Sequence, residues 1–142
     1  MKEKEGIKHG LEIMDKLSVC LLGSNDDDGY PNIKAMSNRR HEGIKKIWFN
    51  TDTSSKRVQQ FRNNNKACVY FLDKELGRGL MLIGTMEILQ NIESKKMVWK
   101  EEDEVFRPLG LEDPEFTVLC FTSEWGEYVD AIKNDGVTFE TK

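Results

Sequence analysis

The strongest constraint on the fold is a series of apolar runs of strand length, each closed by turn-forming residues. Glycine, proline, asparagine and aspartate gather between the runs, as in the segment DDDGYP. Runs of this length bounded by such residues predict β-strands. Because regular helices do not alternate with them, we expect an antiparallel sheet curled into a closed or half-closed barrel. The runs cover residues 18–24, 44–51, 67–73, 80–90 and 115–132.

Further elements complete a mainly β architecture of six to seven strands. Residues 32–39 return as a hairpin partner of 18–24, 115–132 supplies a sixth strand and a seventh, and the tail 136–142 adds an edge strand or frays. Gly84 is the position for a bend or bulge. Helices are expected in three places: an amphipathic helix carrying Ile7, Leu11, Met14 and Leu17, a short helix ended by the asparagines at 63–65, and residues 92–106.

Composition limits the class of protein. The 142 residues fit one domain, 1–142, and 38% hydrophobic with 32% charged residues is typical of a globular chain. A net charge of −4 argues against a nucleic-acid or membrane-surface protein. The first 17 residues hold no apolar run long enough for a signal peptide or membrane span. Cys20, Cys68 and Cys120 lie in apolar runs, so we expect buried thiols in a reducing, cytoplasmic compartment and no metal site.

One segment breaks a local rule. After the strand 44–51 come small polar residues, and Lys56 with Arg57 stand at the start of the next helix. A helix N-terminus carries partial positive charge and free N–H groups, so it favours acids over two cations. A bound phosphate would account for the cations and the nearby hydroxyls together. The alternative is ordinary capping by Asp52, Thr53 or Ser54 with both cations in water. The anion could also be a nucleic-acid backbone.

Other motifs carry less weight. Gly77 and Gly79 lack the third glycine and the following helix of a dinucleotide fingerprint. His9 and His41 are expected at the surface, His41 in a hairpin turn, and no Ser-His-Asp arrangement is present. The pairs Arg39–Arg40 and Lys45–Lys46 are expected on a charged exterior face, with Arg39 the one of them that would lie near a bound ligand. Among the tryptophans, Trp48 is expected in the core, Trp99 between helix and barrel, and Trp125 either packed or closing over a ligand of a second subunit.

The order of segments resembles a known family. A hairpin, then WFNT, SSKR, a helix, NNNKACVYF and LMLIGTMEIL is similar to the pyridoxamine 5′-phosphate oxidase-like FMN-binding split barrels, and most of all to their general stress protein branch. The similarity extends over about residues 6–133. It implies an antiparallel split β-barrel and a homodimer with flavin at the subunit interface.

The resemblance also implies a set of cofactor-binding residues. In that family a strand-end threonine and a Ser-basic-basic triplet hold the FMN phosphate, and the second strand runs along the flavin ring. Relatives carry glutamine near the ring on the long fifth strand; here that residue is glycine, which leaves only its backbone. The matching positions are Lys34, Ala35, Met36, Ser37, Asn50, Thr51, Ser55, Lys56, Arg57 and Gly79.

The expected function is therefore that of an FMN-dependent oxidoreductase with a small-molecule electron donor or acceptor. Pyridoxamine phosphate oxidation itself is not expected, because nothing after Trp125 supplies the C-terminal arginine and histidine of the true oxidases. The alternatives are a flavin-binding or flavin-sensing stress protein without catalysis, and a deazaflavin or haem in place of FMN. No catalytic residue is assigned.

Overall fold

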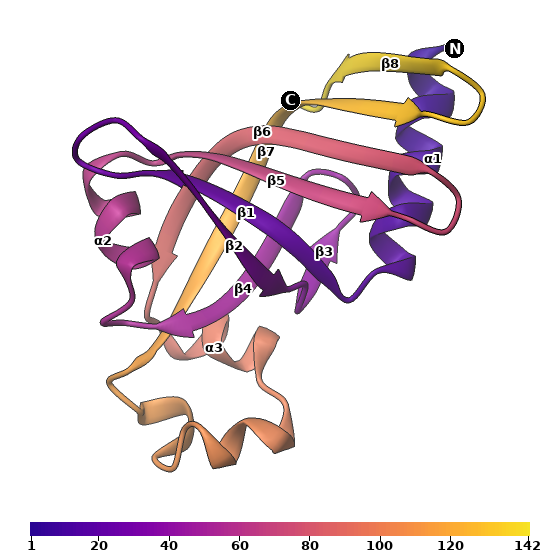
Figure 1. Ribbon diagram of the computed structural model, residues 1–142. Coiled ribbons are helices and arrows are strands. Elements are labelled where there is room, and N and C mark those ends of the chain that lie inside the picture. Colours follow the sequence, from indigo (N-terminus) through magenta and orange to yellow (C-terminus); the bar gives the residue numbers. More distant parts are fainter.

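The computed structural model describes all 142 residues and contains one antiparallel sheet curled into a half-barrel (Figure 1). The strands follow the order β2-β1-β5-β6-β7-β4-β3, and β8 pairs with β7. The predicted mainly β, antiparallel split barrel is confirmed. Strands are β1 (Val19–Asn25), β2 (Pro31–Ser37), β3 (Arg40–Glu42), β4 (Lys46–Asp52), β5 (Lys66–Asp73), β6 (Arg78–Leu89), β7 (Phe116–Asp130) and β8 (Asp135–Glu140). Helices are α1 (Glu3–Lys16), α2 (Lys56–Asn63) and α3 (Ile92–Val98), with 3₁₀ turns at Glu101–Val105 and Gly110–Glu112.

The strand assignment differs from the sequence prediction in two places. The sheet has eight strands, because the three-residue β3, which the prediction took for a turn, pairs with β4 through Arg40 and Trp48. Residues 115–132 form the single 15-residue strand β7 and not two strands. Gly84 marks a bulge as predicted: the β6–β7 register shifts between Ile83 and Gly84. The tail forms the edge strand β8.

The core lies inside the half-barrel. Along β5, buried and exposed residues alternate, as expected for a strand with one face on the core. The first six residues of β7, FTVLCF, are instead all buried, because the barrel core covers one face and α3 with its following turns covers the other. A small second cluster on that other side contains Trp48, Val98 and Phe116, and Trp99 packs against Phe116. The predictions for Trp48 and Trp99 are confirmed.

Helix α1 is present as predicted, and Met14 is buried as expected, but the buried face is shifted so that Ile7 and Leu17 are only partly buried against the core. Its buried residues are Gly6, Gly10, Ile13 and Met14. A Cβ on Gly10 would stand 3.1 Å from Leu80 Cδ1, so the glycines let the helix backbone approach the sheet closely. Leu11 is therefore only half-buried.

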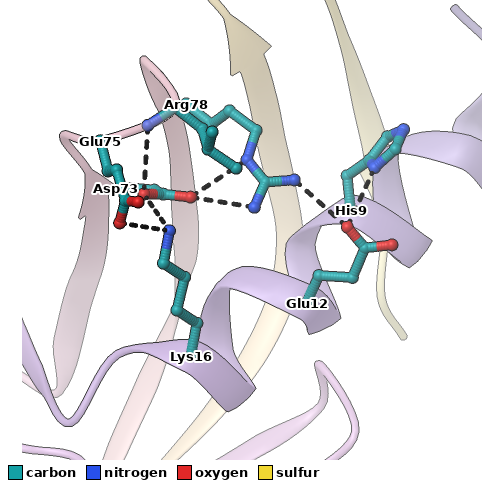
Figure 2. A network of polar contacts seen from close by, with 7 residues as sticks. His9, Glu12, Lys16, Asp73, Glu75 and Arg78 are labelled. Carbon is teal, nitrogen blue, oxygen red and sulfur yellow. Dashed lines mark hydrogen bonds and ion pairs between the residues drawn. The ribbon is translucent and has the colours of Figure 1, made fainter.

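Polar contacts fix the second half of α1 to the β5–β6 hairpin (Figure 2). The buried Asp73 carboxylate accepts from Lys16 Nζ at 2.9 Å and from Arg78 Nη2 at 2.9 Å. Arg78 also reaches Glu12 on α1 at 3.2 Å. The hydrogen bond from Lys16 lowers the pKa of Asp73, and the one with His9 lowers the pKa of Glu12. Among the helices, none combines the length and the apolar character that a membrane span requires.

The helix predicted over 92–106 is interrupted. Helix α3 ends at Val98, and Trp99 is extended with φ −65° and ψ 136°. The Asp103 carboxylate then accepts the Lys100 backbone N–H at 2.9 Å and begins a separate 3₁₀ turn. Since Arg39, 64 positions earlier, donates two hydrogen bonds to the same carboxylate, the interruption depends on a tertiary contact.

Candidate functional site

A cleft of about 260 Å³ opens between the second strand, the end of β4 and the segment after α3. Four residues predicted to bind cofactor line it: Lys34, Met36, Asn50 and Thr51. Lys34 and Met36 are two positions apart on β2, so their side chains share a face of that strand. Lys34 forms no ion pair within the chain and supplies an uncompensated positive charge.

The cleft is connected to the N-terminus of α2 by hydroxyl groups. Thr51 Oγ1 donates to Ser55 Oγ at 3.2 Å, and Ser55 Oγ accepts the Val58 backbone N–H at 3.4 Å. Ser55 is therefore the helix cap, a role that the sequence had suggested for Asp52, Thr53 or Ser54. Ordinary capping is therefore present, but not by those three residues: Asp52 pairs with Arg107, and Thr53 and Ser54 have other partners. Their hydroxyls donate to Pro114 O at 2.7 Å and to Glu115 Oε2 at 2.6 Å.

Both cations of the first α2 turn lack a carboxylate partner. Lys56 is exposed, Arg57 is half-buried, and the first turn of the helix contains no acid. Arg57 Nε is buried without any hydrogen-bond partner. A buried, unsatisfied guanidinium nitrogen costs free energy unless a ligand accepts its hydrogen bond. Free amides, two hydroxyls and two unpaired cations thus lie together at one helix end, which is a suitable environment for a phosphate group.

The remaining predicted residues lie on the opposite, outer face of the sheet. Ala35 and Ser37 alternate with Lys34 and Met36 and so point away from the cleft. Gly79 is buried near the far end of β6, between Leu72 of β5 and Val129 of β7. A single chain therefore brings Lys34, Met36, Asn50, Thr51 and Ser55 together and holds Gly79 apart.

Gly79 is covered by a side chain from the neighbouring strand. A Cβ at this position would stand 2.1 Å from the Tyr70 hydroxyl. The phenol of Tyr70 thus occupies the space that a side chain at 79 would fill, and Gly79 itself offers only its backbone.

No ligand-binding role is predicted from the sequence for four residues of the cleft, Asp52, Asp103, Phe106 and Arg107, and a fifth, Arg39, is predicted only near a ligand. Asp103, Phe106 and Arg107 come from the segment after α3. Arg39 forms a bidentate pair with Asp103, both N–O distances being 2.9 Å. Arg107 Nη1 contacts Asp52 Oδ1 at 2.5 Å, and Nη2 contacts Asn50 Oδ1 at 3.2 Å. No sequence signal indicates these pairs, because their members lie 55 to 64 positions apart.

The outer face carries a wider, apolar groove of about 630 Å³ across β1, β2, β5 and β6. Leu21, Ile33, Cys68, Tyr70 and Ile83 form much of its lining. Trp125, for which the sequence left packing and ligand contact open, is 39% exposed on the same face, paired with Ile83. Exposed apolar side chains gathered on one face are typical of a surface that binds a ligand or a partner.

The two histidines have partners of their own within the chain, and Cys20 has low reactivity. His41 belongs to β3, not to a turn; its Nε2 lies 2.9 Å from Asp15 Oδ1 and its Nδ1 lies 3.0 Å from Gly43 O. His9 stacks on Tyr128 with ring centroids 5.2 Å apart. Burial raises the pKa of Cys20 to about 12, so this thiol is a poor nucleophile.

Solved structures place this fold among known proteins. The chain is 43% identical to a protein from Clostridium acetobutylicum related to general stress protein 26 of Bacillus subtilis, described as of the pyridoxinephosphate oxidase family. The match covers 99% of this chain and 96% of that one, with a TM-score of 0.84. General stress protein 26 from Bacillus anthracis shares 20% identity over 98% of this chain and 100% of that chain, with a TM-score of 0.75.

A more distant likeness extends to a heme binding protein from Mycobacterium smegmatis. It is 10% identical, the match covers 95% of this chain and 57% of that one, and the TM-score is 0.77. This likeness concerns the fold alone. None of the curated proteins matches the sequence.

The family profile described as "Pyridoxamine 5'-phosphate oxidase like" matches residues 5–141, nearly the whole length. This match, the 43% identical structure and the half-barrel with its cleft agree. The chain belongs to the pyridoxamine 5′-phosphate oxidase-like family.

Proposed function

We propose that this protein binds FMN in the cleft beside α2 and acts as an FMN-dependent oxidoreductase. One observation carries the proposal: Lys56 and Arg57 have no acidic partner at a helix N-terminus where the Thr51 and Ser55 hydroxyls also lie. These groups would hold the phosphate. Of this group Thr51 lines the cleft itself, together with Lys34 and Met36, which would contact the flavin ring.

The donor set suits a phosphate-bearing cofactor better than a haem. The cleft lining offers cations, an amide and a hydroxyl, and its two carboxylates are paired with its two arginines. Of the usual axial ligands of haem iron it contains one methionine, Met36, and no histidine, cysteine or tyrosine. Bound FMN would supply hydride and single-electron transfer. The protein would bind the phosphate, orient the ring and leave it open to a small-molecule donor or acceptor.

The proposal includes a homodimer built on the apolar outer face. Ile33, Leu21 and Trp125 are exposed there, and burying apolar area of this kind is the main driving force of association. A second copy on this face would also give Ala35, Ser37 and Gly79, which point away from the cleft of their own chain, a place at the flavin of the partner.

The phosphate assignment predicts a specific loss of affinity. Replacing both Lys56 and Arg57 with alanine removes two charge-assisted contacts of about 1.5–3 kcal/mol each, so FMN binding should weaken at least about tenfold. The measurement is a fluorescence titration of FMN, with circular dichroism to verify folding. The matched control is Arg62→Ala together with Lys133→Ala, two exposed cations away from the α2 N-terminus and from both surfaces, which should leave the affinity unchanged. Unchanged affinity in the folded Lys56/Arg57 variant would remove the assignment.

Catalysis is tested separately from binding. The FMN-loaded protein should oxidise NADH or NADPH steadily with oxygen or an artificial acceptor, faster than free FMN at the same concentration. Tight FMN binding without such turnover would leave a flavin-binding protein and reject the oxidoreductase.

A further inference from the structure

Phe106 is a large aromatic side chain left largely in water beside the cleft. It is 78% exposed and is the one aromatic residue among those that line the cleft. Its neighbours Val105 and Leu109 are also exposed, but they do not line the cleft. Exposing a phenylalanine forgoes burial free energy, so its position at the mouth of a polar cleft needs an explanation.

The backbone around Phe106 is held firmly on both sides. The Phe106 and Arg107 N–H groups both donate to Asp103 O, at 3.0 and 2.8 Å, and the Asp103 side chain is fixed by Arg39. Arg107 is only 6% exposed, and its guanidinium is fixed by Asp52 and Asn50 on β4. The segment is thereby attached to the link between β2 and β3 and to strand β4, and Phe106 lies between these two attachments.

Arg107 is itself incompletely satisfied. Its Nε is buried without a hydrogen-bond partner, although both terminal nitrogens have one. The guanidinium also lies over the Phe116 ring, 5.5 Å from the centroid. This geometry holds Arg107 in one orientation, at the wall of the cleft next to Phe106.

We propose that Phe106 contacts the planar ring of the bound flavin, and that Arg107 is a positioning residue that holds Phe106 over the cleft. An aromatic side chain fixed beside a polar cleft stabilises a flat aromatic ligand by offset or edge contact, and such pairs prefer centroid separations of about 4.5–7 Å. The proposal rests on the proposed FMN site and adds a wall to it that comes from the segment after α3.

The test compares four single variants and one double variant for FMN affinity and for the visible absorption and circular dichroism of the bound flavin. Phe106→Ala should weaken FMN binding about fivefold, because an aromatic pair contributes about 1 kcal/mol, and should shift the flavin spectrum toward that of free FMN. Phe106→Tyr should restore both. Val105→Ala, an equally exposed neighbour outside the cleft, should change neither. Arg107→Met should lower affinity, and adding Phe106→Ala to it should cost little more.

The outcomes separate this inference from the FMN site itself. If the unchanged protein does not bind FMN, the proposed function fails. If it binds FMN and Phe106→Ala leaves both affinity and spectrum unaltered, only the role of Phe106 fails. Loss of dimerisation in Phe106→Ala would place this ring in a protein interface and would overturn the proposal as well. Full additivity of the Arg107 and Phe106 changes would reject the positioning role of Arg107.

Discussion

At the scale of single residues, Gly84 shows how a missing side chain shapes the barrel. A Cβ at this position would stand 1.9 Å from Thr122 O and 2.8 Å from Thr122 C, both backbone atoms of the paired strand β7. Displacing backbone atoms that are hydrogen-bonded within the sheet costs free energy. The absence of a side chain therefore permits the close approach at which the β6–β7 register shifts.

Gly84→Ala should accordingly lower the free energy of unfolding by about 2–3 kcal/mol, the cost of overpacking a tight site. Urea denaturation followed by circular dichroism measures it. Gly23→Ala is the matched control, since a Cβ there meets nothing closer than 3.5 Å. Equal losses in the two variants would contradict the steric explanation.

At the scale of elements, α1 is attached to the barrel by a buried carboxylate as well as by apolar packing. The Asp73 side chain is 1% exposed and accepts hydrogen bonds from Lys16 and Arg78. Figure 2 shows these two cations converging on it from the helix and from β6. A buried carboxylate with two cationic donors is stable only while both donors remain.

Asp73→Asn should destabilise the protein by about 3 kcal/mol, because it leaves Lys16 and Arg78 without their shared anion. Glu75→Gln, which removes the exposed second partner of Lys16, should cost less than about 1 kcal/mol. Chemical denaturation of the three proteins at pH 7 makes the comparison. A cost for Glu75→Gln as large as that for Asp73→Asn would contradict the role of the buried group.

The same carboxylate predicts a pH dependence. The pKa of Asp73 is lowered on folding, chiefly by the hydrogen bond from Lys16, so the unfolded chain binds its proton more readily than the folded one. Its contribution to stability is complete above the unfolded pKa and is lost as pH falls through the folded pKa. The stability difference between the unchanged protein and Asp73→Asn should therefore shrink in acid below about pH 4. A difference that stays constant down to pH 2 would refute this linkage.

At the scale of the whole molecule, the sheet has two unlike faces. The inner face holds the core, and the outer face exposes Leu21, Ile33 and Tyr70 around the apolar groove. In Figure 1 this sheet crosses the middle of the molecule, with α1 at one end and α2 at the other. A second copy on this face would complete the flavin site proposed above.

Ile33→Glu should weaken a dimer of this kind about a hundredfold, because it buries an unpaired carboxylate in an apolar interface. Sedimentation velocity of the unchanged protein should give a dimer at micromolar concentration and the variant a monomer. Ile132→Glu serves as the control, being equally exposed in the β7–β8 turn outside the groove. A monomeric wild-type protein, or an Ile33→Glu variant that dimerises as tightly as the wild type, would rule out this interface.

Patterns among residues close together in the sequence are enough to predict the local elements and the two cations at the start of α2. Apolar alternation fixed β5, the turn residues at 26–31 fixed the first hairpin, and two cations at a helix start marked the phosphate-binding candidate. These are properties of neighbours along the chain. Spacing and local electrostatics alone make them visible.

Contacts between distant segments can be seen only in the folded chain. There α1 packs on its glycines, α3 ends at Val98 beside the Arg39–Asp103 pair, and Phe106 lines the cleft. Residues 92–106 taken alone favour one helix, but a bidentate ion pair and a capped backbone N–H stabilise the interruption. Side chains 55 to 64 positions apart meet only when the sheet closes, because no periodicity in a single segment encodes its partner across the barrel.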